Sequence, residues 1–515
     1  MDTQALRQKI IDLAIRGKLV PQDPNDEPAA ALLKRIHTEK LQMVKDGKLK
    51  AKDIQGDTVI FNGEDNLHYE KFQDGTVKCI ENEIPFEIPD GWIWCRGYSC
   101  FWGMESKKPD GKFFEYIDID SIENKRHCVL SPKKILSSQA PSRASRKLKN
   151  GCIIFSMVRP YLENIAYIDE QLSTCIASTG FYICNPLPLV DAQYLFLLMT
   201  SGYIINGLNQ FMKGDNSPSI RQKDIENWLY PIPPLYEQKR IVDFANRSLS
   251  LNDDITKRIN ELKSTISITK AKILDLAIRG KLVPQDQNDE PASVLIERIR
   301  SEKEKLIKQG KIKRDKNDSV IYKGDDNSYY ANIPKNWSWT SLREITNGFS
   351  LNDGDWILSE NMDENGSVKL IQLGSVGFMR YVDNGFKHIT EAIFEKLSCT
   401  PVKPGYMLIN RIISNKMCVC ILPEIDGKLI TTVDTCWISP NAVNYNLKYI
   451  LYVLSSPQFQ SLVKLSAGGN TRKRISKTNL ISLPIPFPPL MEQQYIVNVI
   501  EKTFSYLDHI LKSLT

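Results

Sequence analysis

Two loops in this chain carry the basic and amide side chains with which a protein can contact a nucleic acid. The first loop is KGDNSPSIRQKD (213–224), and the second is GGNTRKRISK (468–477). Arg and Asn donate hydrogen bonds to base edges, and Lys, Ser and Thr bind phosphate oxygens. We predict such contacts for Lys213, Asn216, Ser217, Ser219, Arg221 and Lys223, and for Asn470, Thr471, Arg472, Lys473, Arg474 and Lys477. The alternative is an ordinary solvated surface.

Three other segments carry side chains of the same kind. They supply Arg143, Arg146 and Lys147 from SRASRKLK (142–149), Arg159 and Tyr161 from RPY (159–161), and Arg411, Asn415 and Lys416 from NRIISNK (410–416). We include all of them as candidate nucleic-acid contacts. Arg159 has an equally good interpretation as a buried structural arginine.

The sequence lacks recognisable catalytic and metal-binding motifs. There is no GxxxxGK[ST] loop for ATP, no glycine-rich cofactor loop, and no Asn/Asp-Pro-Pro-aromatic element of the kind that methylates a flipped adenine. The five histidines are dispersed, and the pair Cys418 and Cys420 has no second pair to complete a zinc site. The eleven cysteines fit free, mostly buried thiols. We expect no catalytic residue, metal or cofactor in this chain.

A long internal repeat organises the chain. Residues 10–23, IIDLAIRGKLVPQD, recur as ILDLAIRGKLVPQD at 273–286, and about two thirds of the positions in 10–50 are identical at this offset. IPDGWIW (88–94) corresponds to IPKNWSW (333–339). Two stretches of low mutual similarity follow, and they end in YPIPPLYEQKRIV (230–242) and LPIPFPPLMEQQYIV (483–497). The order is therefore helical unit, variable domain, helical unit, variable domain and a helical tail.

The helical units show coiled-coil spacing. Apolar residues recur mostly every three, four or seven positions through 241–276 and again through 496–514. We expect Gly17 and Gly280 to end helices, and Asn25-Asp26 and Asn288-Asp289 to begin the next ones. The tail and the N-terminal segment together are about as long as 237–277. We therefore interpret them as two fragments of one helix, and we expect neighbouring chain ends and pseudo-twofold symmetry.

Residues around these helices are candidates for contact with a partner protein. We assign partner docking to Arg16, Lys18, Glu237, Arg279, Lys281 and Glu492. For the Arg-Gly-Lys repeats the alternatives are contact with a nucleic-acid backbone and simple helix capping, because cations are favoured near helix ends. The tryptophans that recur at each domain entrance, Trp92, Trp94, Trp337 and Trp339, favour packing over base stacking.

The fold class that follows is α+β or mixed α/β, with two globular domains joined by two long antiparallel coiled-coil-like helices. Short β-rich runs and short helices alternate in each variable domain. The predicted boundaries are helical region 1–50, linker 51–84, first domain 85–235, helical region 236–313, linker 314–332, second domain 333–490 and C-terminal helix 491–515.

Composition permits binding to a nucleic acid without requiring it. The 515 residues carry a net charge of +6, from 67 basic and 61 acidic residues. No apolar stretch is long enough to span a membrane, and the N-terminus lacks a secretory signal, so we expect a cytoplasmic protein. Two unlike domains on two nearly identical spacers suit a linear polymer with two recognition segments at a fixed separation, which duplex DNA fits best.

These features together resemble the specificity subunits of type I restriction–modification systems. The resemblance covers essentially the whole chain, and it lies in the two proline-rich exits into Glu-Gln, in IFSMVRP (154–160), in ASTGFYICNP (177–186) and in LAIRGKLVPQD. It implies two target-recognition domains that each recognise half of a split DNA sequence. It also implies two docked methyltransferase subunits, restriction–translocase subunits, and S-adenosylmethionine, ATP and Mg on those partners.

Two other functions fit parts of the pattern. A structural adaptor could use two unlike domains to bind proteins, and it would not protect a discrete split DNA sequence. A fused enzyme with hidden methyltransferase activity is disfavoured by the missing motifs, and a methyl-transfer assay on the isolated chain would detect it.

Overall fold

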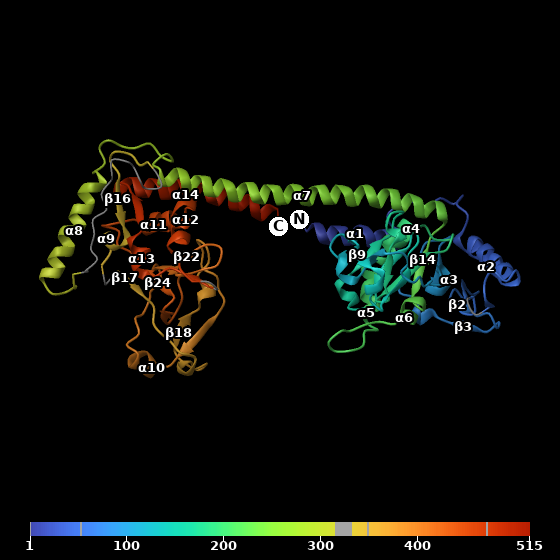
Figure 1. Cartoon of the computed structure of the whole chain (residues 1–515). Helices are drawn as coiled ribbons and strands as arrows, with labels where there is room; N and C mark the ends of the chain where they lie inside the picture. Colours follow the sequence, from blue (N-terminus) through green and yellow to red (C-terminus); the bar gives the residue numbers. More distant parts are fainter. Residues whose placement is uncertain (1, 52–53, 315–331, 348–349, 470–471, 515) are drawn as a thin grey trace. The chain divides into compact units, whose positions relative to one another are not determined.

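The computed structural model describes residues 2–51, 54–314, 332–347, 350–469 and 472–514. The chain divides into two compact units, Met1–Arg258 and Ile259–Thr515. One helix, α7 (Leu235–Ile278), contributes its N-terminal half to the first unit and its C-terminal half to the second (Figure 1). It has 44 residues and is therefore about 66 Å long. This confirms the extended helix that the apolar spacing predicted.

Each unit pairs its half of α7 with a second helix. In the first unit, α1 (Thr3–Ile15) runs antiparallel to α7, since Asn252 donates to the Thr3 carbonyl at 3.0 Å, whereas Gln22, beyond the end of α1, donates to Glu237 near the start of α7 at 3.1 Å. Arg7 also pairs with Asp253 at 3.3 Å. In the second unit, α14 (Leu490–Ser513) lies alongside the C-terminal half of α7 (Figure 1), and Lys270 pairs with Asp508 at 2.5 Å. The two units thus repeat one helix pair.

The apolar seam of α7 is only partly buried within the units. Ile241 and Ile266 are buried, whereas Leu251 is 62% exposed and Leu262 is 39% exposed. The proximity of the chain ends and the pseudo-twofold arrangement of the units stay predictions.

Glycine ends the repeated helices as expected. Gly17 and Gly280 have φ values of +65° and +64°, and the following Lys18 and Lys281 donate their N–H groups back to Leu13 and Leu276. This is the six-to-one bond of a Schellman motif. A Cβ on Gly17 would lie 2.3 Å from Cγ of Pro89, and one on Gly280 would lie 2.3 Å from Cγ of Pro334. Each glycine therefore ends a helix and also lets a proline pack against the turn.

The second repeated helices are α2 (Ala29–Lys45) and α8 (Ala292–Lys308). The expected start at Asn25-Asp26 and Asn288-Asp289 is wrong, because Pro28 and Pro291 occupy the N-cap positions and no side chain caps either helix. The first N–H groups instead reach Gly91 and Asn336 in the domain entrances. Asp26 pairs with Arg240 of α7 at 2.5 Å.

The variable domains share most of their sheet topology, although one sheet of the first domain has an additional strand, β10. In the first, the strand order β12-β11-β14-β5 forms one sheet and β10-β13-β6-β9 a second. In the second domain, β17-β24-β20-β22 forms one sheet and β19-β18-β23 another. The corresponding strands pair in the same sense, since β13 with β6 and β23 with β18 are both parallel. Each domain closes on a two-stranded pair, β15-β4 or β16-β26, that leads into α7 or α14.

The strands of the first domain are β4 (Ile93–Arg96), β5 (Phe101–Trp102), β6 (Phe113–Ile117), β7 (Ile122–Glu123), β8 (Cys128–Val129), β9 (Lys133–Leu136), β10 (Ala144–Lys147), β11 (Ile153–Ser156), β12 (Ile165–Tyr167), β13 (Ile176–Ser178), β14 (Phe181–Pro186) and β15 (Leu229–Ile232). Its helices are α3 (Gly97–Cys100), α4 (Ala192–Met199), α5 (Gly202–Asn209) and α6 (Gln222–Glu226).

The strands of the second domain are β16 (Ser338–Ser341), β17 (Leu351–Asp353), β18 (Val368–Ile371), β19 (Phe386–Ile389), β20 (Met407–Asn410), β21 (Ile412–Ile413), β22 (Val419–Ile421), β23 (Lys428–Thr431), β24 (Thr435–Ile438), β25 (Lys473–Arg474) and β26 (Pro484–Phe487). Its helices are α9 (Leu342–Ile345), α10 (Glu391–Lys396), α11 (Leu447–Ser455), α12 (Pro457–Ser466) and α13 (Lys477–Ser482).

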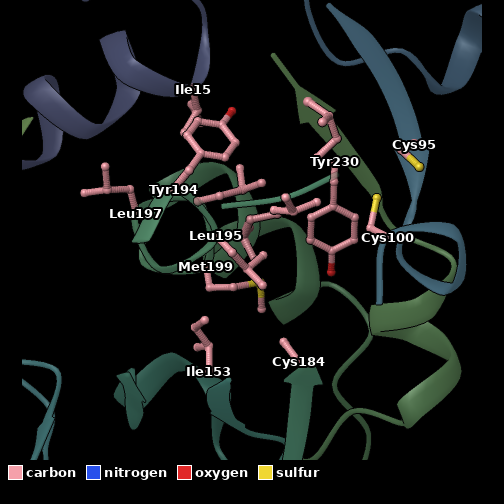
Figure 2. Close-up of a cluster of buried hydrophobic side chains, with 14 of the residues drawn as sticks. Ile15, Cys95, Cys100, Ile153, Cys184, Tyr194, Leu195, Leu197, Met199 and Tyr230 are labelled. Atoms are coloured by element: carbon pink, nitrogen blue, oxygen red, sulfur yellow. The ribbon is translucent and has the colours of Figure 1, made fainter. Parts of the chain in front are cut away.

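The core of each unit joins its helical region to its domain. Figure 2 shows Ile15 of α1 close to Tyr194 and Leu195 of α4, above Ile153 of β11. Trp92, Trp94, Trp337 and Trp339 are all buried, which confirms packing for these side chains. The cysteines are free thiols, and most are buried, as expected.

A buried Glu-Gln pair joins each domain to its helices. In the first unit, Gln22 donates to Glu237 at 3.1 Å, while Gln238 accepts from the Asp191 N–H at 2.6 Å and donates to the Leu189 carbonyl. The second unit repeats this with Gln285 donating to Glu492 at 3.2 Å. Gln493 likewise accepts from the Asn446 N–H at 2.8 Å.

The segment 51–84 is more structured than the expected linker. It contains an antiparallel sheet of β1 (Val59–Asn62), β2 (His68–Lys71) and β3 (Val77–Cys79). Glu70 of β2 is buried and paired with Arg96 at 2.9 Å, which ties the sheet to the first domain. Most of the second linker, 314–332, lies outside the described residues. Among the helices that the structure describes, none is long and apolar enough to cross a membrane.

We predict that Gly17→Ala destabilises the protein more than Gly47→Ala does. Both glycines have positive φ, but a Cβ on Gly47 has no neighbour within 4 Å. Gly47→Ala should therefore show only the left-handed backbone cost, about 1 kcal/mol. Gly17→Ala adds overpacking against Pro89, about 1–3 kcal/mol more. Denaturant unfolding followed by circular dichroism measures both, and equal losses would show that the proline contact is unimportant.

Candidate nucleic-acid interface

In the first domain, two of the predicted segments form one ribbon, the first ribbon (157–159 with 213–220). Val158 and Lys213 both form β-bridges with Ser219, and the Ile220 N–H donates to the Met157 carbonyl at 2.9 Å. The chain that leaves β11 thus lies beside the loop that precedes α6. The structure brings together two segments that are more than fifty residues apart in the sequence.

Arg159 holds the loop of the first ribbon. Its backbone is left-handed, with φ of +48°, its N–H donates to the Pro218 carbonyl at 2.7 Å, and its guanidinium donates to the Asn216 carbonyl at 2.8 Å. The side chain is exposed, so the alternative of a buried structural arginine is wrong. Tyr161 follows in the same turn and is 45% exposed.

The other predicted side chains of this loop face solvent. Lys213, Asn216, Ser217, Arg221 and Lys223 are exposed, and Ser219 is half-buried. Arg221 also pairs with Asp224 at 2.9 Å across the first turn of α6, and this pairing raises the pKa of the guanidinium. The loop therefore exposes its hydrogen-bond donors to solvent, and the Arg221–Asp224 pair holds its C-terminal end in place.

The second domain builds the same ribbon from equivalent segments, the second ribbon (411–413 with 468–469 and 472–475). β21 pairs with β25, Gly468 bridges Arg474, and the Ile475 N–H donates to the Arg411 carbonyl at 3.1 Å. Arg474 thus occupies the place of Ser219, and Gly468 that of Lys213. Gly469 has φ of +107°, and its Cβ position lies 2.5 Å from the Arg472 carbonyl, so the turn needs glycine. Backbone bonds define the ribbon, while its side chains differ between domains.

The cations of the second ribbon are exposed. Arg472, Lys473 and Arg474 all face solvent, and Arg474 pairs with Asp434 at 2.7 Å. Lys477 is half-buried and lies 3.5 Å from Asp353. Asn470 and Thr471 lie outside the described residues. The cations at 472–474 are therefore accessible to solvent, as a DNA contact would require.

Arg411 differs from the expectation of a nucleic-acid contact. It is 6% exposed, its Nε lies 3.4 Å from Asp353, and its guanidinium donates to the Val433 carbonyl. Because a carboxylate and a carbonyl hold its buried guanidinium, Arg411 stabilises the ribbon from the interior of the domain. Asn415 and Lys416, beyond the ribbon, are exposed, and Lys416 lies over the Phe378 ring at 4.5 Å.

The predicted cations of the basic segment 142–149 differ in their exposure to solvent. Arg143 is exposed, and its carbonyl accepts from the Thr179 N–H at 2.8 Å. Arg146 is half-buried on β10. Lys147 pairs with Glu105 at 2.7 Å, and Lys147 and Lys149 together lower the pKa of that carboxyl to about 2. Of the three cations predicted to contact DNA in this segment, Arg143 is exposed and the other two are half-buried.

The predicted docking residues divide into two groups. Lys18 and Lys281 are exposed, and Arg16 and Arg279 are half-buried and bonded to Asp12 and Asp275. Glu237 and Glu492 are each 1% exposed, so the prediction that they form a docking surface is wrong. Burial raises the pKa of both carboxyls, although hydrogen-bond donors that include Gln22 and Gln285 oppose the shift.

Sequence reasoning missed one exposed tryptophan of the second domain. Trp356 is 67% exposed in the segment that follows β17. The sequence shows this tryptophan directly after Gly354-Asp355, outside the two entrance motifs at 88–94 and 333–339. Its isolation from those motifs is the signal that could have indicated a role other than packing. Among the residues that the structure describes, no group of three His, Cys, Asp or Glu side chains could hold a metal ion.

Comparison with known proteins places this architecture in a family. The model of the type I restriction modification DNA specificity domain matches residues 104–264 and 334–514. The EcoEI specificity subunit of a type I restriction enzyme from Escherichia coli is 26% identical, over 99% of this chain and 90% of that protein. The EcoAI specificity subunit from Escherichia coli is 30% identical, over 66% of this chain and 62% of that protein.

A solved structure supports the fold independently of these sequence matches. It comes from work on complex assembly and conformational transition of the type I R-M system, and it matches with a TM-score of 0.59 at 22% identity. The match covers 84% of this chain and 94% of that chain. The family model alone spans more than half of the sequence, once in each unit. The chain belongs to the type I restriction modification DNA specificity family.

Proposed function

We propose that this chain is the specificity subunit of a type I restriction–modification complex and recognises a DNA target in two parts, one for each domain. One observation carries the proposal: both domains build the same ribbon by backbone pairing, yet they line it with different side chains. Equivalent scaffolds with different donors suit two different half-sites.

The electrostatics of the ribbons support contact with DNA. The first ribbon includes the exposed cations Arg159 and Lys213 and is followed directly by Arg221. The second ribbon carries Arg472, Lys473 and Arg474. Arg forms bidentate bonds with guanine, and cations near phosphates supply affinity that falls with salt. The carboxylates nearby, Asp353 and Asp434, are already paired with cations. Arg411 acts here by holding the second ribbon in place.

The chemistry of the complex belongs, in this proposal, to other subunits. Two methyltransferase subunits would dock on the helical regions, where Lys18 and Lys281 are exposed at equivalent turns, and restriction–translocase subunits would join them. S-adenosylmethionine, ATP and Mg would bind those partners, and this chain would be non-catalytic. The complex would act in the cytoplasm, where its DNA substrate lies.

We predict that Arg472→Ala and Arg474→Ala weaken DNA binding about tenfold or more, because each removes a cation from the second ribbon. The measurement is footprinting and affinity of the full chain with its methyltransferase subunits on a split target, found by mapping methylation in host DNA. Recognition of the second half-site should relax, and that of the first should stay. The slope of log affinity against log salt should fall by about 0.9 for each lost phosphate contact.

Lys448→Ala is the matched control, since Lys448 is an exposed cation of the same domain on α11 that pairs with Glu501 of α14. It should bind like the parent chain. Unaltered specificity of the two arginine variants would remove the ribbon from the interface. Failure of the parent complex to protect any split sequence would instead favour a structural adaptor, and methyl transfer by the isolated chain would reveal a fused enzyme.

We also predict that the length of α7 sets the distance between the half-sites. Seven residues inserted after Glu261 would leave the Asp253 and Lys270 pairings in place on either side. Because seven helical residues add about 10.5 Å, the unrecognised spacer should lengthen by at most about three base pairs, or binding should be lost. Methylation mapping measures the spacer, and an unchanged spacer with full binding would contradict this role.

A further inference from the structure

An exposed tryptophan lies three residues after Asp353, whose carboxylate pairs with Arg411 of the second ribbon. Trp356 is 67% exposed, and Leu358, two residues later, is 46% exposed. Ile357 between them packs into the core around Val368 and Leu370. Side chains of an extended segment alternate between its faces, so Trp356 and Leu358 share the outer one. Large apolar side chains on an outer face are costly in water and indicate a contact surface when they gather.

The backbone that carries Trp356 is held firmly. Gly354 and Asp355 donate their N–H groups to Thr435 and Thr431 at 2.8 Å each, and the Asp355 carbonyl accepts from Val433 at 2.9 Å. A Cβ on Gly354 would lie 2.2 Å from Thr431 Oγ1, so the two segments touch closely. The Asp355 carboxylate accepts from the Thr400 N–H at 3.0 Å. The backbone just before Trp356 is therefore held in place, and the Trp356 side chain extends into solvent.

The same turn also supports the second ribbon. Asp434 pairs with Arg474 at 2.7 Å, and its carbonyl accepts from the Arg411 N–H at 2.8 Å. The Val433 carbonyl accepts from the Arg411 guanidinium. Residues 431–435 thus join Trp356 on one side to the cations of the ribbon on the other.

We propose that Trp356, with Leu358, is a DNA wedge that inserts between two base pairs of the half-site recognised by the second domain. This inference rests on the proposed function. Apolar side chains inserted between base steps partly unstack and bend the duplex, and the bend brings more protein surface onto it. The cations Arg472 and Lys473 of the second ribbon would bind phosphates of the same half-site. Pyrimidine–purine steps yield most easily, so the wedge would favour such a step.

In the first domain, the segment that corresponds to 354–358 carries no exposed pair of large apolar side chains. The segment that follows its corresponding strand, β5, carries Lys107 and Lys108, and the Lys107 N–H donates to the Ser145 carbonyl at 2.9 Å. Two lysines would hold phosphates without entering the base stack. A wedge from this segment is therefore expected in the second half-site, and the lysines at the same place in the first domain would leave the base stack intact there.

The test uses the full chain with its methyltransferase subunits and a split target carrying 2-aminopurine at single positions. The parent complex should raise 2-aminopurine fluorescence at one step in the second half-site. Trp356→Ala should abolish that signal and weaken binding about tenfold to a hundredfold, the scale of one base–aromatic contact. Trp356→Phe should keep most of both, because a smaller aromatic ring still fills the step.

Val443→Ala is the matched control, because Val443 is 66% exposed in a loop whose Asn446 contacts Gln493 of α14. It should leave the signal and affinity unchanged. Unchanged fluorescence and affinity in Trp356→Ala, with the parent bound, would overturn the wedge alone. Loss of methyltransferase assembly, seen by gel filtration without DNA, would also overturn it and assign the surface to a partner protein. A parent complex that binds no split target would overturn the proposed function itself.

Discussion

The buried Glu-Gln pair at the start of α7 and α14 is the constraint on which each unit depends. Glu237 and Glu492 accept from a glutamine in the repeated turn, and Gln238 and Gln493 bind backbone groups of the domain. Two neighbouring residues thus fasten a helix to a turn and to a domain at once. Their burial is nearly complete, so an unpaired member would leave a desolvated polar group that costs about 1–3 kcal/mol.

This fastening allows the domains to diverge. The ribbon of each domain is built by backbone hydrogen bonds between the same two segments, and those bonds do not depend on side-chain identity. Ser219 and Arg474 can therefore occupy equivalent places. The surface changes while the frame that positions it stays the same, which is the property expected of a protein that recognises two unlike sequences.

Much of the fold was predictable because it follows from local patterns. The repeat, the length of α7, the glycine ends at Gly17 and Gly280 and the buried entrance tryptophans all follow from residue type and spacing. The family resemblance is confirmed by the match in both units. The exposed basic loops also lie where their composition suggested, although their contact with DNA stays a prediction.

The misplaced residues are those whose environment depends on distant parts of the chain. Glu237 looks like an exposed helix residue until Gln22 is known to meet it, and Arg411 looks like a DNA contact until Asp353 and Val433 are known to surround it. The strands β1, β2 and β3 pair into a sheet within the expected linker, and Arg96 of the domain pairs with Glu70 of that sheet. Asn25 and Asp26 have good capping chemistry, but Asp26 is engaged by Arg240.

The near-verbatim repeat has a genetic consequence. The turn at Gly17 packs against Pro89 and Trp92, and the turn at Gly280 packs against Pro334 and Trp337 in the same way. A crossover between genes within the stretch that encodes LAIRGKLVPQD would join a foreign recognition domain to a helical region with the same turn. The proline and the tryptophan at the entrance of the new domain would then pack against the glycine of that turn as they do here. Such a recombinant would acquire a new target without any new interface having to evolve.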